Sequence, residues 1–353
     1  MRARRGTRRG LRALAAGLAA LALVLAPAAL DGTRAAFSAT TSNVGDELAT
    51  RQLQPPSGLT VTQSCAAAPA VTRRASSTGT GTASVALPMP AGTTAGDFLL
   101  AHVAYHDGVQ TLTAPSGWAL VGQSTNSGSV TSAVFWKVAA TGEPGAVFRH
   151  PNSGSAVLFA GGVTAFRGVR PVTPPFADAV GSSFTATTPS VGTSNAGVQV
   201  VHLFSKTQGP LDPAPGATDF YGDATGSGDT VHVGIRAAGE TFAGPGSTPT
   251  RSATAATSSR WVAQAVVLER VADTPSANLS WTKSSSSWAD GYELTRQVGG
   301  GGQVTQPAVP GVATQAVTNG PLVNGTSYTF RLSASRGTWR SSAVAAAPFT
   351  PNC

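Results

Sequence analysis

The stretch Leu322-Val323-Asn324-Gly325-Thr326-Ser327-Tyr328-Thr329-Phe330 decides the fold of the C-terminal part of this 353-residue chain. Asn-Gly is a strong turn signal, and the residues after it alternate between apolar and polar as far as Ala334, which predicts a strand with one buried face. Upstream, two more pairs of apolar residues each share one strand face: Leu279 with Trp281, and Tyr292 with Leu294. With a glycine turn at 299–302, the pattern predicts an antiparallel sandwich from about residue 277 onward.

These motifs resemble those of a fibronectin type III domain. In that family the second strand carries Leu-x-Trp, here Leu279-Ser280-Trp281, and the sixth begins with Leu, a turn and Tyr-x-Phe, here residues 322–330. The resemblance implies that Tyr328 is the corner tyrosine, with its hydroxyl bonded to the backbone upstream.

The first strand of such a domain is missing from this region. The segment 273–353 is shorter than the roughly 100 residues of a seven-stranded sandwich. However, Pro55-Pro56-Ser57-Gly58-Leu59-Thr60-Val61-Thr62 resembles the family's opening strand. We therefore predict a fibronectin type III-like sandwich made of residues 53–65 and 273–353, interrupted between its first and second strands by residues 66–272. A tandem arrangement, with the insert first and a separate sandwich second, is the alternative.

The chain has two cysteines, Cys65 and Cys353. An even count in an exported protein indicates a disulfide, two unpaired thiols being the alternative. Strands of the sandwich mostly reverse direction at each step, so its first and seventh strands end at the same pole. We expect a Cys65–Cys353 bridge there, closing the interrupted domain.

The insert, residues 66–272, is expected to be an all-β, jelly-roll-like sandwich. About nine strands are indicated, the clearest being 97–106, 131–139, 155–169, 197–206, 229–237 and 259–271, and none has helical periodicity. A jelly roll suits an insertion because its first and last strands often pair. The insert resembles a β-sandwich module of exported bacterial surface proteins, on segments such as Ala95-Gly96-Asp97-Phe98-Leu99-Leu100 and Phe135-Trp136-Lys137-Val138-Ala139. That module is similar to carbohydrate-binding modules. The resemblance implies no particular activity.

The N-terminus resembles a secretion signal, with basic residues before an apolar run from Leu11 to Leu30. We predict a signal peptide over residues 1–36, with an uncleaved membrane anchor as the alternative, and an N-terminal arm over residues 37–52. Residues 34–50 are similar to the stretch after the signal in SipW-type exported proteins. Residues 1–36 carry seven Arg and one Asp, so the net charge of +8 falls to about +2 without them. Since the remaining basic residues are scattered, no nucleic-acid partner is expected.

Motifs for catalysis are absent from the sequence. Neither a Gly-x-Ser-x-Gly elbow nor a phosphate loop occurs, so the protein is not expected to be an enzyme, and no cofactor is predicted. His102, His202 and His232 lie mid-strand and could form a metal site if their strands were neighbours, but structural histidines are the preferred interpretation, and no metal is predicted. Asp219, Asp223 and Asp229 lie in a glycine-rich loop that offers oxygen ligands for calcium, a solvated acidic loop being the default.

Aromatic residues supply the predicted ligand contacts, because sugar rings stack on Trp and Tyr. Trp118, and Tyr105 with His106 and Asp107, are assigned to strand ends or loops and form the candidate ligand-binding set. For Trp118 a tight turn with the ring folded onto the core is the alternative. Three other tryptophans lie in alternating strands and are predicted to be core: Trp136, Trp261 and Trp281. Two more are predicted to be partly exposed: Trp288 and Trp339.

Together these features predict a non-enzymatic bacterial protein, secreted or at the cell surface, that displays a β-sandwich head for adhesion or surface assembly. The alternative is a carbohydrate-binding module for a cell-wall or environmental polysaccharide. The expected partners are a glycan or a cell-surface protein, with membrane contact only through the signal segment before its cleavage. Composition agrees with a folded β protein, because 41% of residues are apolar and only 11% are charged, unlike coiled coils and charged disordered chains.

Overall fold

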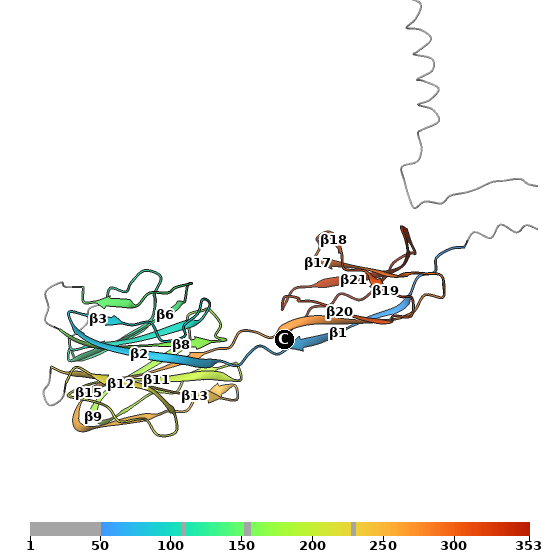
Figure 1. Cartoon of the computed structure of the whole chain (residues 1–353). Coiled ribbons are helices and arrows are strands. Elements are labelled where there is room, and N and C mark those ends of the chain that lie inside the picture. The colour runs from blue at the N-terminus through green and yellow to red at the C-terminus, as the bar shows by residue number, and fades with distance from the viewer. Residues whose placement is uncertain (1–50, 108–110, 152–156, 227–230) are drawn as a thin grey trace, which may run out of the picture. The chain divides into compact units, whose positions relative to one another are not determined.

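The first strand of the outer sandwich pairs with a strand that follows it by more than 200 residues. The computed structural model describes residues 51–107, 111–151, 157–226 and 231–353. In it β1 (Ser57–Ala66) runs antiparallel to β16 (Thr274–Thr282), with Val61 opposite Leu279. Figure 1 shows the blue β1 beside orange and red strands from the other end of the chain. The predicted interruption between the first and second strands is confirmed.

The outer sandwich consists of two antiparallel sheets. One has the order β1–β16–β20, where β20 is Ala316–Asn319. The other has the order β18–β17–β21–β22, with β19 also on β17 and β23 also on β21. Its strands are β17 (Gly291–Val298), β18 (Gln303–Thr305), β19 (Val309–Pro310), β21 (Tyr328–Arg336), β22 (Trp339–Arg340) and β23 (Val344–Ala345). This is the strand order expected of a fibronectin type III sandwich.

The predicted alternating residues form the core between these two sheets. Leu279, Trp281, Tyr292, Leu294 and Phe330 are all at most 4% exposed and pack in one cluster. The hydroxyl of Tyr328 accepts a hydrogen bond from the backbone N–H of Val323 at 2.9 Å, which confirms the predicted corner tyrosine. The bond holds the turn that precedes β21 against the strand.

Removing that hydroxyl should weaken the outer sandwich. In Tyr328→Phe the buried ring remains, but the N–H of Val323 loses its acceptor. We expect the free energy of unfolding to fall by about 0.5 to 1.5 kcal/mol, the usual net contribution of one hydrogen bond, because the freed N–H belongs to an exposed residue. Urea denaturation followed by tryptophan fluorescence measures this, and Thr329→Ala, a substitution that keeps the corner hydroxyl, is the control. Equal stability of Tyr328→Phe and the parent protein would contradict the assigned role.

The insert is a second sandwich of two five-stranded antiparallel sheets. The first has the order β2–β8–β4–β6–β5 and the second β12–β13–β11–β15–β9. The first contains β2 (Thr72–Thr82), β4 (Phe98–Tyr105), β5 (Ala119–Asn126), β6 (Val130–Val138) and β8 (Leu158–Arg167). The second contains β9 (Phe176–Thr187), β11 (Val198–Thr207), β12 (Thr218–Ala224), β13 (Val233–Phe242) and β15 (Ser252–Leu268). Short pairs flank them: β3 (Ser84–Leu87) with β7 (Ala146–Arg149), and β10 (Gly192–Thr193) with β14 (Gly246–Ser247).

The two sheets of the insert repeat one strand order. If the five strands of each sheet are numbered along the chain, they lie in the order 1–5–2–4–3 in both sheets. The flanking pairs repeat as well, because β3–β7 and β10–β14 each join the segment after the first strand to the segment after the fourth. The insert is therefore two copies of one topological unit, packed face to face.

The facing sheets interlock through glycines. A Cβ atom on Gly162 of β8 would lie 2.4 Å from the ring of Tyr221 on β12, and one on Gly122 of β5 would lie 2.5 Å from the ring of Phe176 on β9. The glycines thus make room for aromatic rings of the opposite sheet. At the edges, β5 is covered by Phe176 and the Arg73 guanidinium of β2 lies 4.9 Å from the Phe220 ring centre of β12. The edge strands of the two sheets therefore pack against each other, β5 on β9 and β2 on β12.

The sandwich prediction for the insert is confirmed, but its connectivity differs from a jelly roll. In a jelly roll successive strands cross between the two sheets, whereas here each sheet is one continuous half of the insert. The first and last strands, β2 and β15, belong to different sheets. The two ends of the insert are instead joined where the N–H of Ala68 donates to Asp273 Oδ1 at 2.9 Å, and the link between its two halves reaches the same region, where Val169 bridges Arg270.

No helix occurs among the residues described, which agrees with the all-β prediction. Consequently no helix in this part of the chain has the length and apolarity needed to cross a bilayer. The predicted signal peptide and nearly all of the predicted arm lie outside the described residues.

Candidate functional site

A disulfide closes the split outer domain. Cys65 near the end of β1 is bonded to Cys353, the last residue, with their Cα atoms 5.8 Å apart. The side chain of Gln63 also bonds both backbone polar groups of Asn352, at 2.9 Å each, and the N–H of Cys353 donates to Asn324 Oδ1 at 2.7 Å. The predicted bridge is confirmed, and it ties the C-terminus to the strand from which the insert departs.

The two passages between the domains lie side by side at this point. Cys65 is opposite Pro275 and Ala66 is opposite Thr274, so the outgoing and returning chains pair until the insert begins. Asp273 then accepts from the N–H of Ala68 and forms an ion pair with Arg270. The Arg270 partner and the backbone bond lower the pKa of the Asp273 carboxyl.

Tyr105 must be removed from the candidate ligand-binding set. Its side chain is 0% exposed, stacks on Phe159 at 5.2 Å between ring centres and meets His150 edge-on. Every residue of β4 is buried, because this strand is central in its sheet and covered on both faces. Tyr105 is therefore buried although it is the last residue of its strand.

The other three predicted contacts are partly exposed. His106 donates its backbone N–H to Leu158 O at 3.1 Å, and Asp107 lies 3.4 Å from the imidazole of His150. Trp118 belongs to a turn in which its N–H donates to Pro115 O, and its ring packs edge-on against Phe148 at 5.5 Å. The Trp118 ring is thus folded onto the core, as the alternative interpretation held.

The histidines considered for a metal site have separate environments. His102 is fully buried between the insert's sheets, where its Nε2 lies 2.8 Å from the Ser205 hydroxyl and 3.1 Å from that of Ser132. His202 points to the opposite face of its sheet. Within the described ranges, no three His, Cys, Asp or Glu side chains lie together as a metal site would require.

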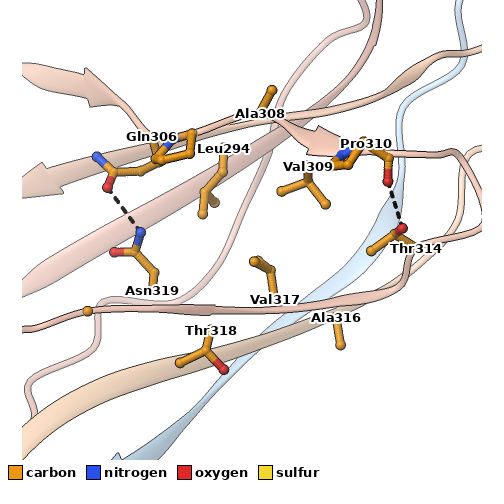
Figure 2. A pocket seen from close by; sticks show the side chains of 12 residues that line it. Leu294, Gln306, Ala308, Val309, Pro310, Thr314, Ala316, Val317, Thr318 and Asn319 are labelled. Atoms are coloured by element: carbon orange, nitrogen blue, oxygen red, sulfur yellow. Dashed lines mark hydrogen bonds between the residues drawn. The ribbon is translucent and has the colours of Figure 1, made fainter.

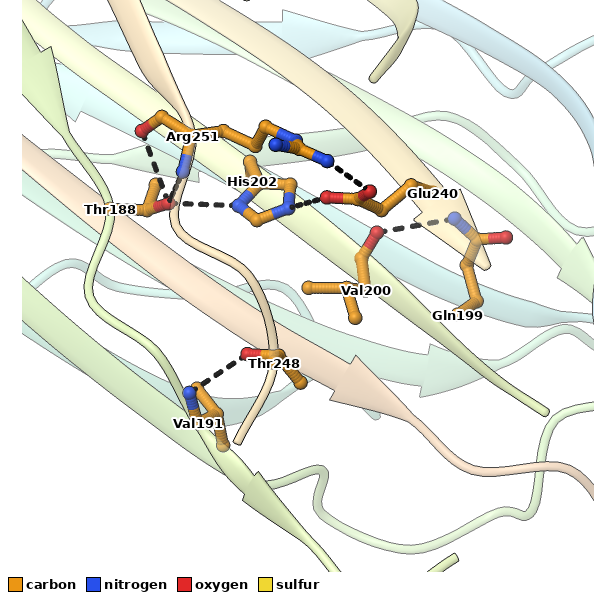
Figure 3. Close-up of polar contacts among 8 residues, drawn as sticks. All are labelled: Thr188, Val191, Gln199, Val200, His202, Glu240, Thr248 and Arg251. Carbon is orange, nitrogen blue, oxygen red and sulfur yellow. Dashed lines mark hydrogen bonds and ion pairs between the residues drawn. The ribbon is translucent and has the colours of Figure 1, made fainter. Parts of the chain in front are cut away.

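His202 belongs to a hydrogen-bonded chain that has the composition of a catalytic triad (Figure 3). Thr188 Oγ1 lies 2.8 Å from His202 Nδ1, and His202 Nε2 lies 3.1 Å from Glu240 Oε1. Since a carboxylate only accepts, Nε2 donates to Glu240 and Nδ1 accepts from the Thr188 hydroxyl. Burial lowers the pKa of His202 despite the opposing effect of Glu240, so the ring is neutral at pH 7.

The hydrogen-bonded series Thr188–His202–Glu240 has a structural role. Thr188 is 0% exposed, so its hydroxyl cannot reach a substrate. It also accepts from the N–H of Arg251 at 3.1 Å, and the Arg251 guanidinium bonds Glu240 at 2.6 Å. The four side chains clamp the segment after β9 to the segment before β15.

The acidic loop considered for calcium is engaged in protein contacts. Asp219 forms a two-pronged ion pair with Arg236, at 2.8 and 2.7 Å, and Asp223 accepts from the N–H of Ala224 at 2.8 Å. Asp229 lies outside the described residues. The two carboxylates that can be placed are therefore not presented together to a cation.

A groove of about 450 Å³ opens at the edge of the outer sandwich, between β19 and β20 (Figure 2). Leu294, Val309 and Val317 form its apolar floor. One end is closed by the bond from Asn319 Nδ2 to Gln306 Oε1 at 3.0 Å. None of the lining residues is charged, so the groove offers no acid, base or ion-binding group.

The most exposed aromatic surface lies at one end of the outer sandwich. Trp339 is 62% exposed, and its ring stands edge-on to that of partly buried Trp288, with 6.2 Å between centres and 86° between planes. The Arg336 guanidinium covers the Trp288 ring at 5.3 Å. The partial exposure predicted for both rings is confirmed, whereas their contact was not predicted because they are separated in the sequence.

Comparison with known proteins adds little to this description. No protein family and no curated protein sequence matches the chain. Among solved structures, titin domains A168–A170 match with 13% identity, covering 84% of this chain and 99% of theirs, at a TM-score of 0.19. The chicken CNTN1 FN1–FN3 domains match with 11% identity, covering 85% and 100%, at a TM-score of 0.20. Such scores carry no assignment, so the strand order itself identifies the fold: a fibronectin type III-like sandwich interrupted by a second β-sandwich.

Proposed function

We propose that the chain is an exported, non-enzymatic protein that holds the inserted sandwich out for adhesion or surface assembly. The observation that carries the proposal is the Cys65–Cys353 bridge beside the two passages to the insert. Disulfides persist in oxidising compartments outside the cytoplasm. The basic and apolar segment in residues 1–36 supports the same location.

The split arrangement suits a display role because the head is attached through two strands. A domain in tandem is connected by one linker, whereas the insert leaves through β1 and returns through β16, which are paired over their length. Pulling the head away from the outer sandwich would require breaking this ladder, and the bridge from Cys65 to the C-terminus still holds the outer domain closed. The attachment therefore resists both thermal opening and mechanical load.

Export and display can be tested in a bacterial host that secretes the full chain. We would replace Ser182, an exposed residue of the insert, by Cys and label intact cells and spent medium with a membrane-impermeant maleimide. Labelled protein with an oxidised Cys65–Cys353 pair outside the cell supports the proposal. Labelling only after lysis, with both native thiols reduced, would overturn it.

Adhesion is tested separately with two sets of beads. One set carries the mature chain, and the other carries a chain in which the insert, residues 66–272, is replaced by a short turn. Attachment to cells that depends on the insert supports the head as the adhesive part. Attachment that is equal for both chains would assign adhesion to the outer sandwich instead.

A further inference from the structure

We propose that the corner formed by Trp288 and Trp339 binds a neutral glycan, with a sugar ring stacked on the Trp339 indole. This goes beyond the display function, since it places a binding site on the outer sandwich rather than on the head. Of the six tryptophans, all in the described part of the chain, Trp339 is the one whose side chain is classed as exposed. Large exposed aromatic rings are typical of binding surfaces.

The turn that carries Trp339 is held rigid. Arg336 and Trp339 are paired across a two-residue loop, in which Gly337 has a φ of 50°, a conformation that favours glycine. The N–H of Gly337 donates to Asp290 Oδ2 at 2.9 Å. Arg340 donates to the carbonyl groups of Gly337 and Trp339 at 2.7 and 2.9 Å. A ring presented by a fixed backbone loses little entropy on binding.

The shape of the corner suits a flat ring of moderate size. Trp288 stands nearly perpendicular to Trp339, so one indole offers a face while the other forms a wall beside it. The Trp288 ring is restrained by packing against the core of the outer sandwich and by Arg336, which stacks on the ring and donates to the Trp288 carbonyl oxygen at 3.1 Å. The C–H face of a pyranose stacks on an indole, and such aromatic contacts contribute beyond the area that they bury.

The polar groups beside the corner favour a neutral ligand with hydroxyl groups. Two cations contact the turn or its neighbour, Arg336 and Arg340, and two anions balance them: Asp290, which accepts from the turn, and Glu293, which is paired with Arg340. Asp290 is exposed and uses one carboxylate oxygen for Gly337, which leaves the other for a hydroxyl donor. The site thus offers both a hydrogen-bond donor and a hydrogen-bond acceptor. It has no net positive charge that would favour an anionic ligand.

A protein partner fits this surface less well. Specific protein interfaces need an apolar centre within a total buried area of roughly 1,200 Å² or more. The other large exposed apolar residues of the outer sandwich are Val298, Val304 and Val323. They lie toward the Tyr328 end of β21, where Val298 is opposite Tyr328, whereas Trp339 is opposite Arg336 at the other end. A single exposed ring matches one sugar unit better than a protein face.

The proposal is tested with the mature chain and four probes, the hexaoses of cellulose, chitin, xylan and β-1,4-mannan, by calorimetry and tryptophan fluorescence. We expect at least one to bind, with Trp339→Ala weakening its affinity by about tenfold or more and Trp339→Phe by about threefold or less. Phe184→Ala, which removes a 56% exposed ring from the head, is the matched control and should leave the affinity unchanged.

Three results would overturn the site. The first is that none of the four sugars binds. The second is binding that survives Trp339→Ala, and if that binding is lost in Trp118→Ala the sugar lies on the head. The third comes from sedimentation of the parent protein. Thermal melting of each variant separates lost binding from lost folding, and we expect Trp339→Ala to melt within about 2 °C of the parent because its ring is mainly in water. Sedimentation of the parent protein shows whether the ring joins two copies instead, a result that would also overturn the proposal.

Discussion

Replacing both cysteines by serine is expected to destabilise the outer sandwich by about 4 to 5 kcal/mol while leaving the insert unaffected. The bridge stabilises the fold mainly by lowering the conformational entropy of the unfolded chain, and this effect grows with the length of the loop that the bridge closes. The cysteines are 288 residues apart, but the ends of the folded insert are held together near Ala68 and Asp273. The loop that gains freedom is therefore mostly the outer segment 273–353, and the chain-entropy model still gives a large effect for that length.

Two unfolding transitions should make this visible. In guanidinium chloride, the transition reported by the buried Trp281 should move to lower denaturant, whereas that of the insert should stay in place. The parent protein reduced with dithiothreitol is the matched control and should behave like the double variant. A change below about 1 kcal/mol in the outer transition would show that the Gln63 and Asn324 contacts close the domain without the covalent bond.

Acid is expected to destabilise the insert through His102. Burial lowers the pKa of this imidazole from 6.5 to about 3, and in the described structure its Nδ1 has no hydrogen-bond partner. Between these two values the unfolded chain binds a proton that the folded chain does not. Stability therefore falls as the pH drops from about 6.5 toward 3, by about 1.4 kcal/mol per pH unit and by up to about 5 kcal/mol in all. Above pH 6.5 the contribution is constant.

The variant His102→Gln removes this titration while keeping a polar group near Ser132 and Ser205. We expect it to be less stable than the parent at pH 7, because the buried hydrogen bonds are altered, but to lose less stability on acidification. His106→Gln, at a partly exposed histidine, provides the matched control. Urea denaturation at pH 7, 6, 5 and 4 gives the slopes. Equal slopes for His102→Gln and the parent would mean that other groups cause the acid sensitivity.

Sequence reasoning succeeded where the outer domain obeys simple periodicity. The central strands β16 and β21 each have one buried face and one more exposed face, so the alternation around Leu279 and Phe330 reports burial directly. The turn at Asn324-Gly325 and the two cysteines then fixed the topology. The interruption could be inferred because a single strand was missing, and one matching segment lay far upstream.

The insert resisted the same reasoning. In β4 and β11 every residue is buried, so periodicity does not separate the two faces, and Tyr105 was wrongly taken as accessible. The repeated strand order has no clear signal in the residues, because corresponding strands bury different side chains: His102 lies between the sheets and His202 on the outer face of its own. The Trp288–Trp339 contact was missed because packing, rather than spacing, brings the rings together.

The split has a consequence for biosynthesis. β1 emerges before the whole insert, whereas its partner β16 is made only after residue 273. At synthesis rates of about 5 to 20 residues per second, the nascent first strand waits roughly 10 to 40 s for that partner. Its composition is suited to the delay: the side chains of Thr60, Thr62 and Gln63 face water in the finished protein, so the lone segment offers little that would attract a wrong neighbour while translation continues.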